Sequence, residues 1–171
     1  MKNGLCILCA FFLVCFVGLS VSHAAVLPDG RYHIKFFDRY VSAPNMNNGT
    51  RLALNYSTKA TVWELKHLGN DVYSIRAKSK CMDSSGGKKY DGVPIILYTY
   101  LGQQNQRWKI EKYKSDYILI NVKTGLALDV PGGKASVGAQ LQGYPVNRSI
   151  AQRFKIYTLD KPDTSLLNLL F

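Results

Sequence analysis

The stretch QNQRWKI, residues 104–110, is followed by a shortened copy, AQRFKI, at residues 151–156. A looser version, ATVWELK, stands at residues 60–66. One aromatic side chain holds the same place in each segment, and successive copies are 45 and then 46 residues apart. A period of this length indicates one supersecondary unit that is used three times. The three aromatic residues are Trp63, Trp108 and Phe154.

Short apolar-alternating runs fill the intervals between these aromatic residues. RYHIKFF at 31–37, DVYSIRA at 71–77 and SDYILINV at 115–122 each have a tyrosine near their start, and clusters of Gly, Pro and Asn separate such runs. Runs this short between turn signals predict an all-β fold of about twelve strands. Three units that close on each other bury the apolar face that none can bury alone, and leave no sheet edge free. The predicted repeats are about 29–66, 70–111 and 115–157.

The closing segments carry a motif as well as a period. QRW at 106–108 matches a QxW pattern, QRF at 152–154 matches it with Phe for Trp, and TVW at 61–63 keeps only the aromatic residue. On these residues the chain resembles the ricin-type lectin family over about 29–157. The resemblance implies a β-trefoil in which the aromatic residue fills the shared core and the Gln hydrogen-bonds the backbone of its own unit. Kunitz-type inhibitors, fibroblast growth factors and interleukin-1-like cytokines share the trefoil without this motif and are the structural alternatives.

The resemblance also implies where a sugar would bind. In the family a turn aspartate, a stacking aromatic residue and an asparagine before the QxW motif form the site, and the second unit has Asp83, Tyr98 and Asn105 with Gln106 at these places. An aromatic face stacks on the C–H side of a pyranose, while a carboxylate and an amide bind neighbouring hydroxyls. The alternative is that Asp83 caps its own turn and Tyr98 is ordinary strand packing.

Two positions of the second unit depart from the family pattern. Ile96 stands where the family often has Gln, and Tyr100 stands where a family cysteine would pair with Cys81. The usual disulfide of the unit is therefore lost. We expect Cys81 to be a buried, inert thiol, because free cysteine is often buried.

The third unit offers a less complete site. Asp129 takes the place of the carboxylate, Gln142 that of the strand Gln and Tyr144 that of the stacking ring, but Ala151 stands where the second unit has its asparagine. Asn147 is a possible substitute, yet it begins the sequon NRS. A glycan on Asn147 would crowd this pocket.

The first unit is not expected to bind sugar, because Ser42 replaces the aspartate and Asn55 the aromatic residue. It carries two further sequons, at Asn48 and Asn55. In a eukaryotic secretory route each sequon is a glycosylation acceptor and is expected on the surface.

The chain begins with a pattern typical of secretion. Lys2 is followed by an apolar run over 5–19 and by small residues, with SHA at 22–24, which predicts a signal peptide over 1–24. The alternative is a membrane anchor, but the run is short for a helix that needs about 20 apolar residues. Cleavage removes three of the four cysteines, so a secreted mature chain has no intrachain disulfide. Those three are Cys6, Cys9 and Cys15.

The charge balance favours anionic partners. Lys and Arg number 22 against 11 Asp and Glu, a formal net charge of +11, and the basic residues gather in the second and third units. Such a surface attracts sulfated glycans, anionic cell surfaces or acidic proteins. The expected function is a secreted, monomeric binder of glycans or glycoproteins. One alternative is a secreted effector that acts through loops on a host protein target, as a protease or coagulation inhibitor, or a vasoactive or receptor-binding protein. The other is charge-driven binding of sulfated polysaccharide.

No catalytic constellation is visible in the sequence. His33 and His67 are isolated, with no Cys or carboxylate at metal spacing, and no P-loop, HExxH or nucleophile-elbow motif is present. We therefore expect no enzymatic activity, cofactor, metal or nucleic-acid partner. The expected C-terminal tail, 158–171, ends in the apolar segment SLLNLLF at 165–171, which could clasp the barrel mouth or bind a partner.

Overall fold

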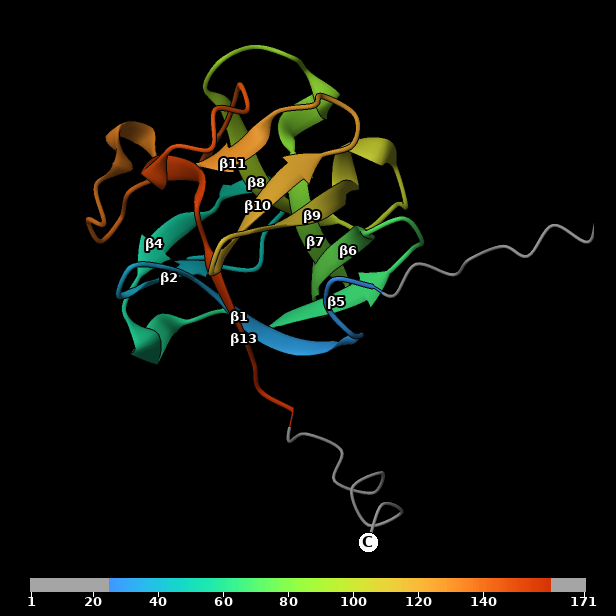
Figure 1. Ribbon diagram of the computed structural model, residues 1–171, viewed down its shortest axis with the longest axis horizontal. Coiled ribbons are helices and arrows are strands. Elements are labelled where there is room, and N and C mark those ends of the chain that lie inside the picture. The colour runs from blue at the N-terminus through green and yellow to red at the C-terminus, as the bar shows by residue number, and fades with distance from the viewer. Residues whose placement is uncertain (1–24, 161–171) are drawn as a thin grey trace, which may run out of the picture.

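The computed structural model describes residues 25–160, which form thirteen short strands and five single-turn 3₁₀ helices (Figure 1). The expected signal peptide and the apolar segment 165–171 lie outside the described residues. The strands of the first unit are β1 (Gly30–Phe36), β2 (Arg39–Ser42), β3 (Thr50–Arg51), β4 (Ala53–Asn55) and β5 (Trp63–His67). The second unit has β6 (Val72–Ala77), β7 (Lys80–Ser84), β8 (Val93–Thr99) and β9 (Arg107–Tyr113). The third has β10 (Asp116–Asn121), β11 (Ala127–Asp129), β12 (Gln142–Tyr144) and β13 (Lys155–Thr158). The 3₁₀ helices are η1 (Ser57–Lys59), η2 (Ser85–Gly87), η3 (Gln104–Gln106), η4 (Pro131–Gly133) and η5 (Ile150–Gln152).

The prediction of an all-β trefoil is confirmed, with one strand more than the approximate twelve. The extra strand arises because the third strand of the first unit is interrupted at Leu52. Its first half, β3, pairs with β8 of the second unit, while its second half, β4, pairs with β2 of its own unit. This short segment therefore ties two of the three units together.

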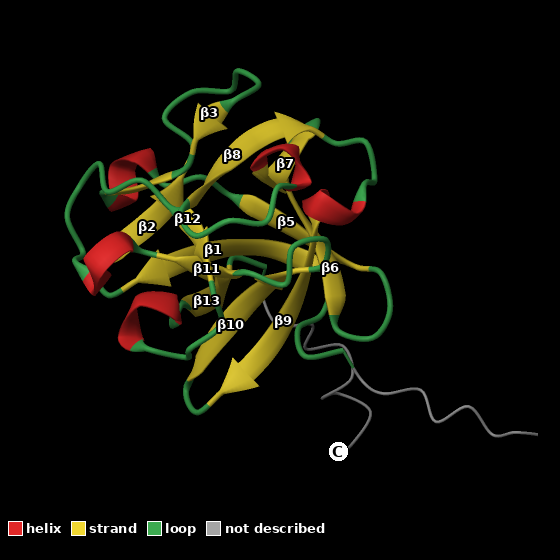
Figure 2. Cartoon of the chain, turned by 90° about the horizontal axis from the view of Figure 1, so that it is seen from above, coloured by secondary structure: helices red, strands yellow, loops and turns green. Residues whose placement is uncertain are grey.

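The sheet closes on itself, as Figures 1 and 2 show. The first strand, β1, pairs antiparallel with the last, β13, with Tyr32 opposite Thr158. In every unit the opening tyrosine lies opposite a closing aromatic residue. The three pairs are Tyr32 with Trp63, Tyr73 with Trp108 and Tyr117 with Phe154. Closure of this kind leaves no long unpaired edge on the barrel.

The core is built from the residues that mark the period. Trp63, Trp108 and Phe154 are each 0% exposed. A buried indole needs an acceptor for its N–H, and both tryptophans find one at the same place: Trp63 Nε1 donates to the carbonyl of Val41 and Trp108 Nε1 to that of Met82, at 3.0 Å each. The repeated aromatic residues therefore serve chiefly to fill one shared core.

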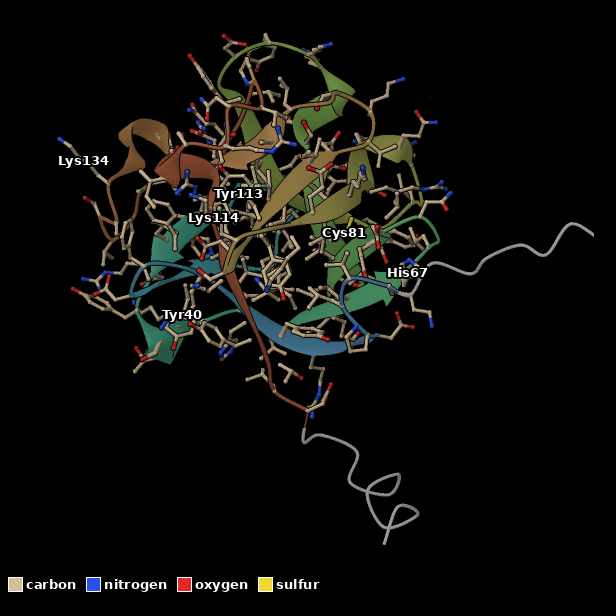
Figure 3. The ribbon with its side chains drawn as sticks, viewed as in Figure 1. Tyr40, His67, Cys81, Tyr113, Lys114 and Lys134 are labelled. Carbon is tan, nitrogen blue, oxygen red and sulfur yellow. The ribbon has the colours of Figure 1, made fainter. Side chains whose placement is uncertain are left out.

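Cys81 is buried and unpaired, and burial raises the pKa of its thiol to about 12 (Figure 3). The second unit is held without a disulfide. Arg76 lies opposite Cys81 in the β6–β7 ladder, and its guanidinium stacks on the ring of Tyr100, with Cζ 3.7 Å from the ring centroid. The stack joins Tyr100, the residue at the position of the family's second cysteine, to the strand beside Cys81.

Candidate functional site

The second unit brings its four predicted residues together at one end of the β7–β8 hairpin. Asp83 on β7 lies opposite Ile96 on β8, and Tyr98, two residues further along β8, falls on the same face of the strand. Asn105 and Gln106 come from η3, which follows β8. Asp83, Tyr98 and Asn105 line one pocket of about 370 Å³. The residues that complete its lining are Ser85, Gly86, Ile96, Leu101 and Gln103.

Gln106 links the backbone of its unit to the carboxylate. Its Oε1 accepts the N–H of Leu101 at 2.7 Å, and its Nε2 donates to the carbonyl of Thr99 at 2.9 Å. The expected hydrogen bonding of this Gln to its own unit is confirmed. The same Nε2 also donates to Asp83 Oδ2 at 2.9 Å, so the motif glutamine orients the candidate ligand-binding group.

Asn105 holds the carboxylate from the pocket side. Its Nδ2 lies 3.0 Å from both carboxylate oxygens of Asp83, which can only accept, so its own Oδ1 is directed away from Asp83. The side chain of Asn121 fixes η3 by donating to the main-chain carbonyl of Asn105 at 2.9 Å. An ionised carboxylate has about four acceptor sites, and these contacts occupy three. One site on Asp83 Oδ1 is left for a hydroxyl donor.

In the third unit two side-chain amides also donate to the aspartate carboxylate, but one of them comes from a different position. Gln152 Nε2 donates to Asp129 Oδ2 at 3.3 Å, and Gln142 Nε2 donates to Asp129 Oδ1 at 2.8 Å. Asp129, Gln142, Tyr144 and Asn147 line a pocket of about 430 Å³ with Ala151. The amide missing at Ala151 is thus supplied by Gln142, the strand residue whose equivalent in the second unit is Ile96.

Burial determines how readily the carboxyl groups of Asp83 and Asp129 are protonated. Asp83 is 3% and Asp129 4% exposed, and burial raises the pKa of each carboxyl above its ordinary value. The hydrogen bonds from the glutamine and asparagine amides act in the opposite direction and only partly offset this effect. Both groups are therefore easier to protonate than an exposed aspartate.

The first unit has no comparable arrangement. Ser42 lies opposite Ala53, and Asn55 lies opposite Tyr40, so neither a carboxylate nor an aromatic ring stands at the equivalent places. The predicted acceptor residues Asn48 and Asn147 are exposed and Asn55 is half-buried. Whether the three carry glycans stays a prediction.

Sequence reasoning interpreted two glycine clusters only as turns between strands, and not as one wall of each pocket. SGG at 85–87 and PGG at 131–133 follow the two aspartates at the same distance, which was a usable signal. Gly86 and Gly132 have φ of 63° and 67°, a left-handed conformation that glycine adopts without cost. These turns are η2 and η4, and each lies beside the carboxylate of its own unit.

The two isolated histidines have packing partners. His33 meets the ring of Tyr40 edge-on and His67 packs against Tyr73. Within residues 25–160 no three His, Cys, Asp or Glu side chains gather in a way that could hold a metal ion. In the same range no helix has the length and apolar character to cross a membrane.

Comparison with known proteins places the chain in a family. Residues 59–144 and 104–169 match the ricin-type beta-trefoil lectin domain-like family, and the chain belongs to it. A curated relative is the Probable lipoprotein EnvE of Salmonella typhimurium, 36% identical over 61 residues, which are 33% of this chain and 35% of that protein. The chain thus matches about a third of that relative's length.

Several solved structures share the fold. The designed threefold symmetric protein ThreeFoil is 25% identical with a TM-score of 0.72, over 77% of this chain and 100% of its own. A mosquitocidal holotoxin is 20% identical with a TM-score of 0.72, over 79% of this chain and 18% of its own. The Polyporus squamosus lectin, solved bound to a human-type influenza-binding epitope, is 19% identical with a TM-score of 0.68, over 79% of this chain and 51% of its own.

Proposed function

We propose that this protein binds carbohydrate through the pocket of its second unit. The observation that carries the proposal is the Asp83 carboxylate, clamped by Asn105 and Gln106 beside Tyr98 in one pocket. Membership of a lectin-like family supports carbohydrate binding in general, and the pocket supports the particular site.

The geometry favours a sugar with two adjacent hydroxyl donors. One acceptor site remains on Asp83 Oδ1, and Asn105 Oδ1 points away from the carboxylate and can accept a second hydroxyl. Tyr98 is 38% exposed, which leaves ring surface for the C–H face of a pyranose. A flat sugar face with vicinal equatorial and axial hydroxyls, as in galactose, meets these requirements.

The third unit is proposed as a second, weaker site. Asp129 has two amide donors, so two of its acceptor sites remain, and Tyr144 is 37% exposed. Its pocket lacks the acceptor that Asn105 supplies, because Ala151 stands there. Asn147 lines the same pocket, and a glycan on it would compete for the space.

Calorimetry with galactose-type and glucosamine-type sugars tests the proposal. Tyr98→Ala is the cleaner variant, because Asp83→Asn turns an amide nitrogen toward the donors Asn105 and Gln106. Hydrogen bonds to a charged acceptor contribute roughly 1.5–3 kcal/mol, so Asp83→Asn should weaken binding by about tenfold to a hundredfold. Asp129→Asn is the matched control in the third unit and should do less. No heat with any sugar, or the same affinity in all variants, would remove this function and favour an effector that acts through its loops.

We further propose that the mature chain is secreted and monomeric. The proposal rests on the signal-peptide pattern over 1–24 and on Cys81, which is buried and so not placed to link two chains. N-terminal sequencing of protein collected from the medium should begin at Ala25, and light scattering should report one chain. An uncut N-terminus would contradict secretion by this route.

A further inference from the structure

A second hollow, of about 470 Å³, adjoins the pocket of the second unit between η2 and η3. The two cavities share Gly86, Gln103 and Asn105 in their walls. The two cavities therefore lie side by side. We call it the basic hollow, and its lining residues are 86–87, 102–105, Arg107 and Lys123.

Two cationic side chains line the basic hollow, and a third lies beside one of its lining glycines. Arg107 and Lys123 line it, and the stem of Lys88 lies over Gly86, with Cε 3.7 Å from the place of a Cβ on that glycine. None of its lining residues is Asp or Glu. Among the ion pairs of residues 25–160, none involves any of these three cations. Their charge is available to a ligand.

The guanidinium of Arg107 is oriented as well as charged. Its Nε and Nη2 donate to the carbonyl of Gly102 at 3.2 and 2.8 Å, which fixes the side chain without neutralising it. The stem of Lys123 lies beside Gly87. Its Cγ lies 3.2 Å from the place of a Cβ on Gly87, a position that is also 3.4 Å from the Cβ of Asn105. The lysine thus runs beside the asparagine of the proposed sugar site.

The basic hollow is a property of the second unit and not of the fold. In the third unit the glycine equivalent to Gly87 is Gly133, whose nearest side chains are Ile150 and Ala151. Lys123 reaches the second unit from the β10–β11 turn of the third unit, which spans 122–126. The corresponding turns of the first and second units have only two residues each, 37–38 and 78–79.

We propose that the basic hollow is a subsite for an anionic substituent on the sugar bound at Asp83, either a carboxylate or a sulfate ester. This inference rests on the proposed sugar site and names the class of glycan that fits it. The sugar ring would lie against Tyr98, and its acidic group would meet Lys123 and Arg107 in charge-assisted hydrogen bonds. Because these cations are solvent-exposed, the gain is modest and decreases as salt screens it.

The test compares a neutral galactoside with the same galactoside carrying a sulfate, and separately a sialic acid, by calorimetry at low and high salt. The acidic sugars should bind about tenfold more tightly than the neutral one at low salt, as expected for a few exposed charge pairs. Lys123→Gln should lower the ratio of acidic-sugar to neutral-sugar affinity about three- to fivefold. It should change the affinity of the neutral sugar less than about twofold. The sulfate and sialic acid arms show which anion the hollow prefers.

Lys134→Gln is the matched control, since it removes the same charge. Lys134 follows η4 in the third unit and projects at the edge of the molecule away from Cys81 (Figure 3). Equal affinity for neutral and acidic sugars, or equal losses in the two variants, would overturn the subsite. Tyr98→Ala separates this failure from that of the sugar site: acidic sugars that bind with unchanged affinity to Tyr98→Ala would show charge binding alone, and both proposals would fall.

Discussion

Asn105 donates its side-chain amide to both carboxylate oxygens of Asp83, at 3.0 Å each. The third unit reaches a similar result by another route, because Gln142 on β12 donates to Asp129 at 2.8 Å where the second unit has the apolar Ile96. Each buried carboxylate therefore has two amide donors. One is the Gln of the QxW motif, and the other comes from a position that differs between the two units. Burying a carboxylate without hydrogen-bond donors costs free energy. This explains why the third unit, which has Ala151 in place of Asn105, has Gln142 in place of Ile96.

Asn105→Ala should weaken sugar binding about tenfold with a small effect on melting temperature. The variant removes one acceptor for the sugar and two contacts to Asp83, while Gln106 still holds the carboxylate. Titration calorimetry measures the affinity, and circular dichroism checks that the fold is kept. Wild-type affinity in this variant would show that Asn105 does not touch the ligand.

Ala151→Asn in the third unit is the reciprocal change and should strengthen the weaker site. The position equivalent to Asn105 then carries an acceptor beside Asp129 and Tyr144. The expected readout is a stoichiometry that rises toward two sugars per chain. It should be measured on protein without a glycan at Asn147. An unchanged stoichiometry would mean that the third pocket fails for another reason.

Sugar affinity should fall on acidification at a pH above the ordinary aspartate pKa of 3.8, because burial raises the pKa of Asp83 and the sugar needs the ionised form. The folded state does not unfold through this group. A raised pKa in the folded state means that protonation favours folding, so the contribution of Asp83 to stability is present below 3.8 and decreases as pH rises through the folded-state pKa. Affinity and near-ultraviolet circular dichroism measured from pH 3.5 to 7 in roughly half-unit steps separate the two effects. An affinity midpoint at or below 3.8 would contradict this assignment.

Trp108→Ala should lower the free energy of unfolding by about 3–5 kcal/mol, the usual cost of a large core truncation. Trp108→Phe is the matched variant, because the third unit already has Phe154 at this position. It keeps most of the packing but leaves the Met82 carbonyl without its indole donor, at a cost of about 1–3 kcal/mol. Urea titrations measure both losses, and a free energy of unfolding for Trp108→Phe equal to that of the wild type would show that the hydrogen bond contributes nothing beyond the packing.

Cys81 should not react with thiol reagents at neutral pH while the protein is folded. Its pKa is raised to about 12 by burial, so almost no thiolate is present, and the residue is 0% exposed. Rapid labelling should appear only in denaturant. The melting temperature should be the same with and without reductant, and a marked decrease under reduction would reveal a disulfide between two chains.

The sequence by itself determined the threefold architecture, and its resemblance to a known family predicted which residues of the second unit lie together. The regular spacing of the aromatic residues predicts a shared core. Core positions can be predicted from the sequence because burial requires an apolar residue at the same position in every repeat. Asp83, Tyr98, Asn105 and Gln106 were predicted to lie together from the resemblance to the ricin-type lectin family, and the structure brings them together within one unit. Their role in binding sugar remains a prediction.

Only the tertiary structure decided which side chains meet across the strands, both between units and within one. Between units, β3 pairs with β8 beside the break at Leu52, and Lys123 reaches the second-unit site from the third unit. Within units, Gln142 donates to Asp129 in the third, and Arg76 stacks on Tyr100 beside Cys81 in the second. These contacts depend on turn lengths and on the register between strands that are distant in sequence. Local residue patterns do not encode them, because strand pairing fixes which side chains face each other.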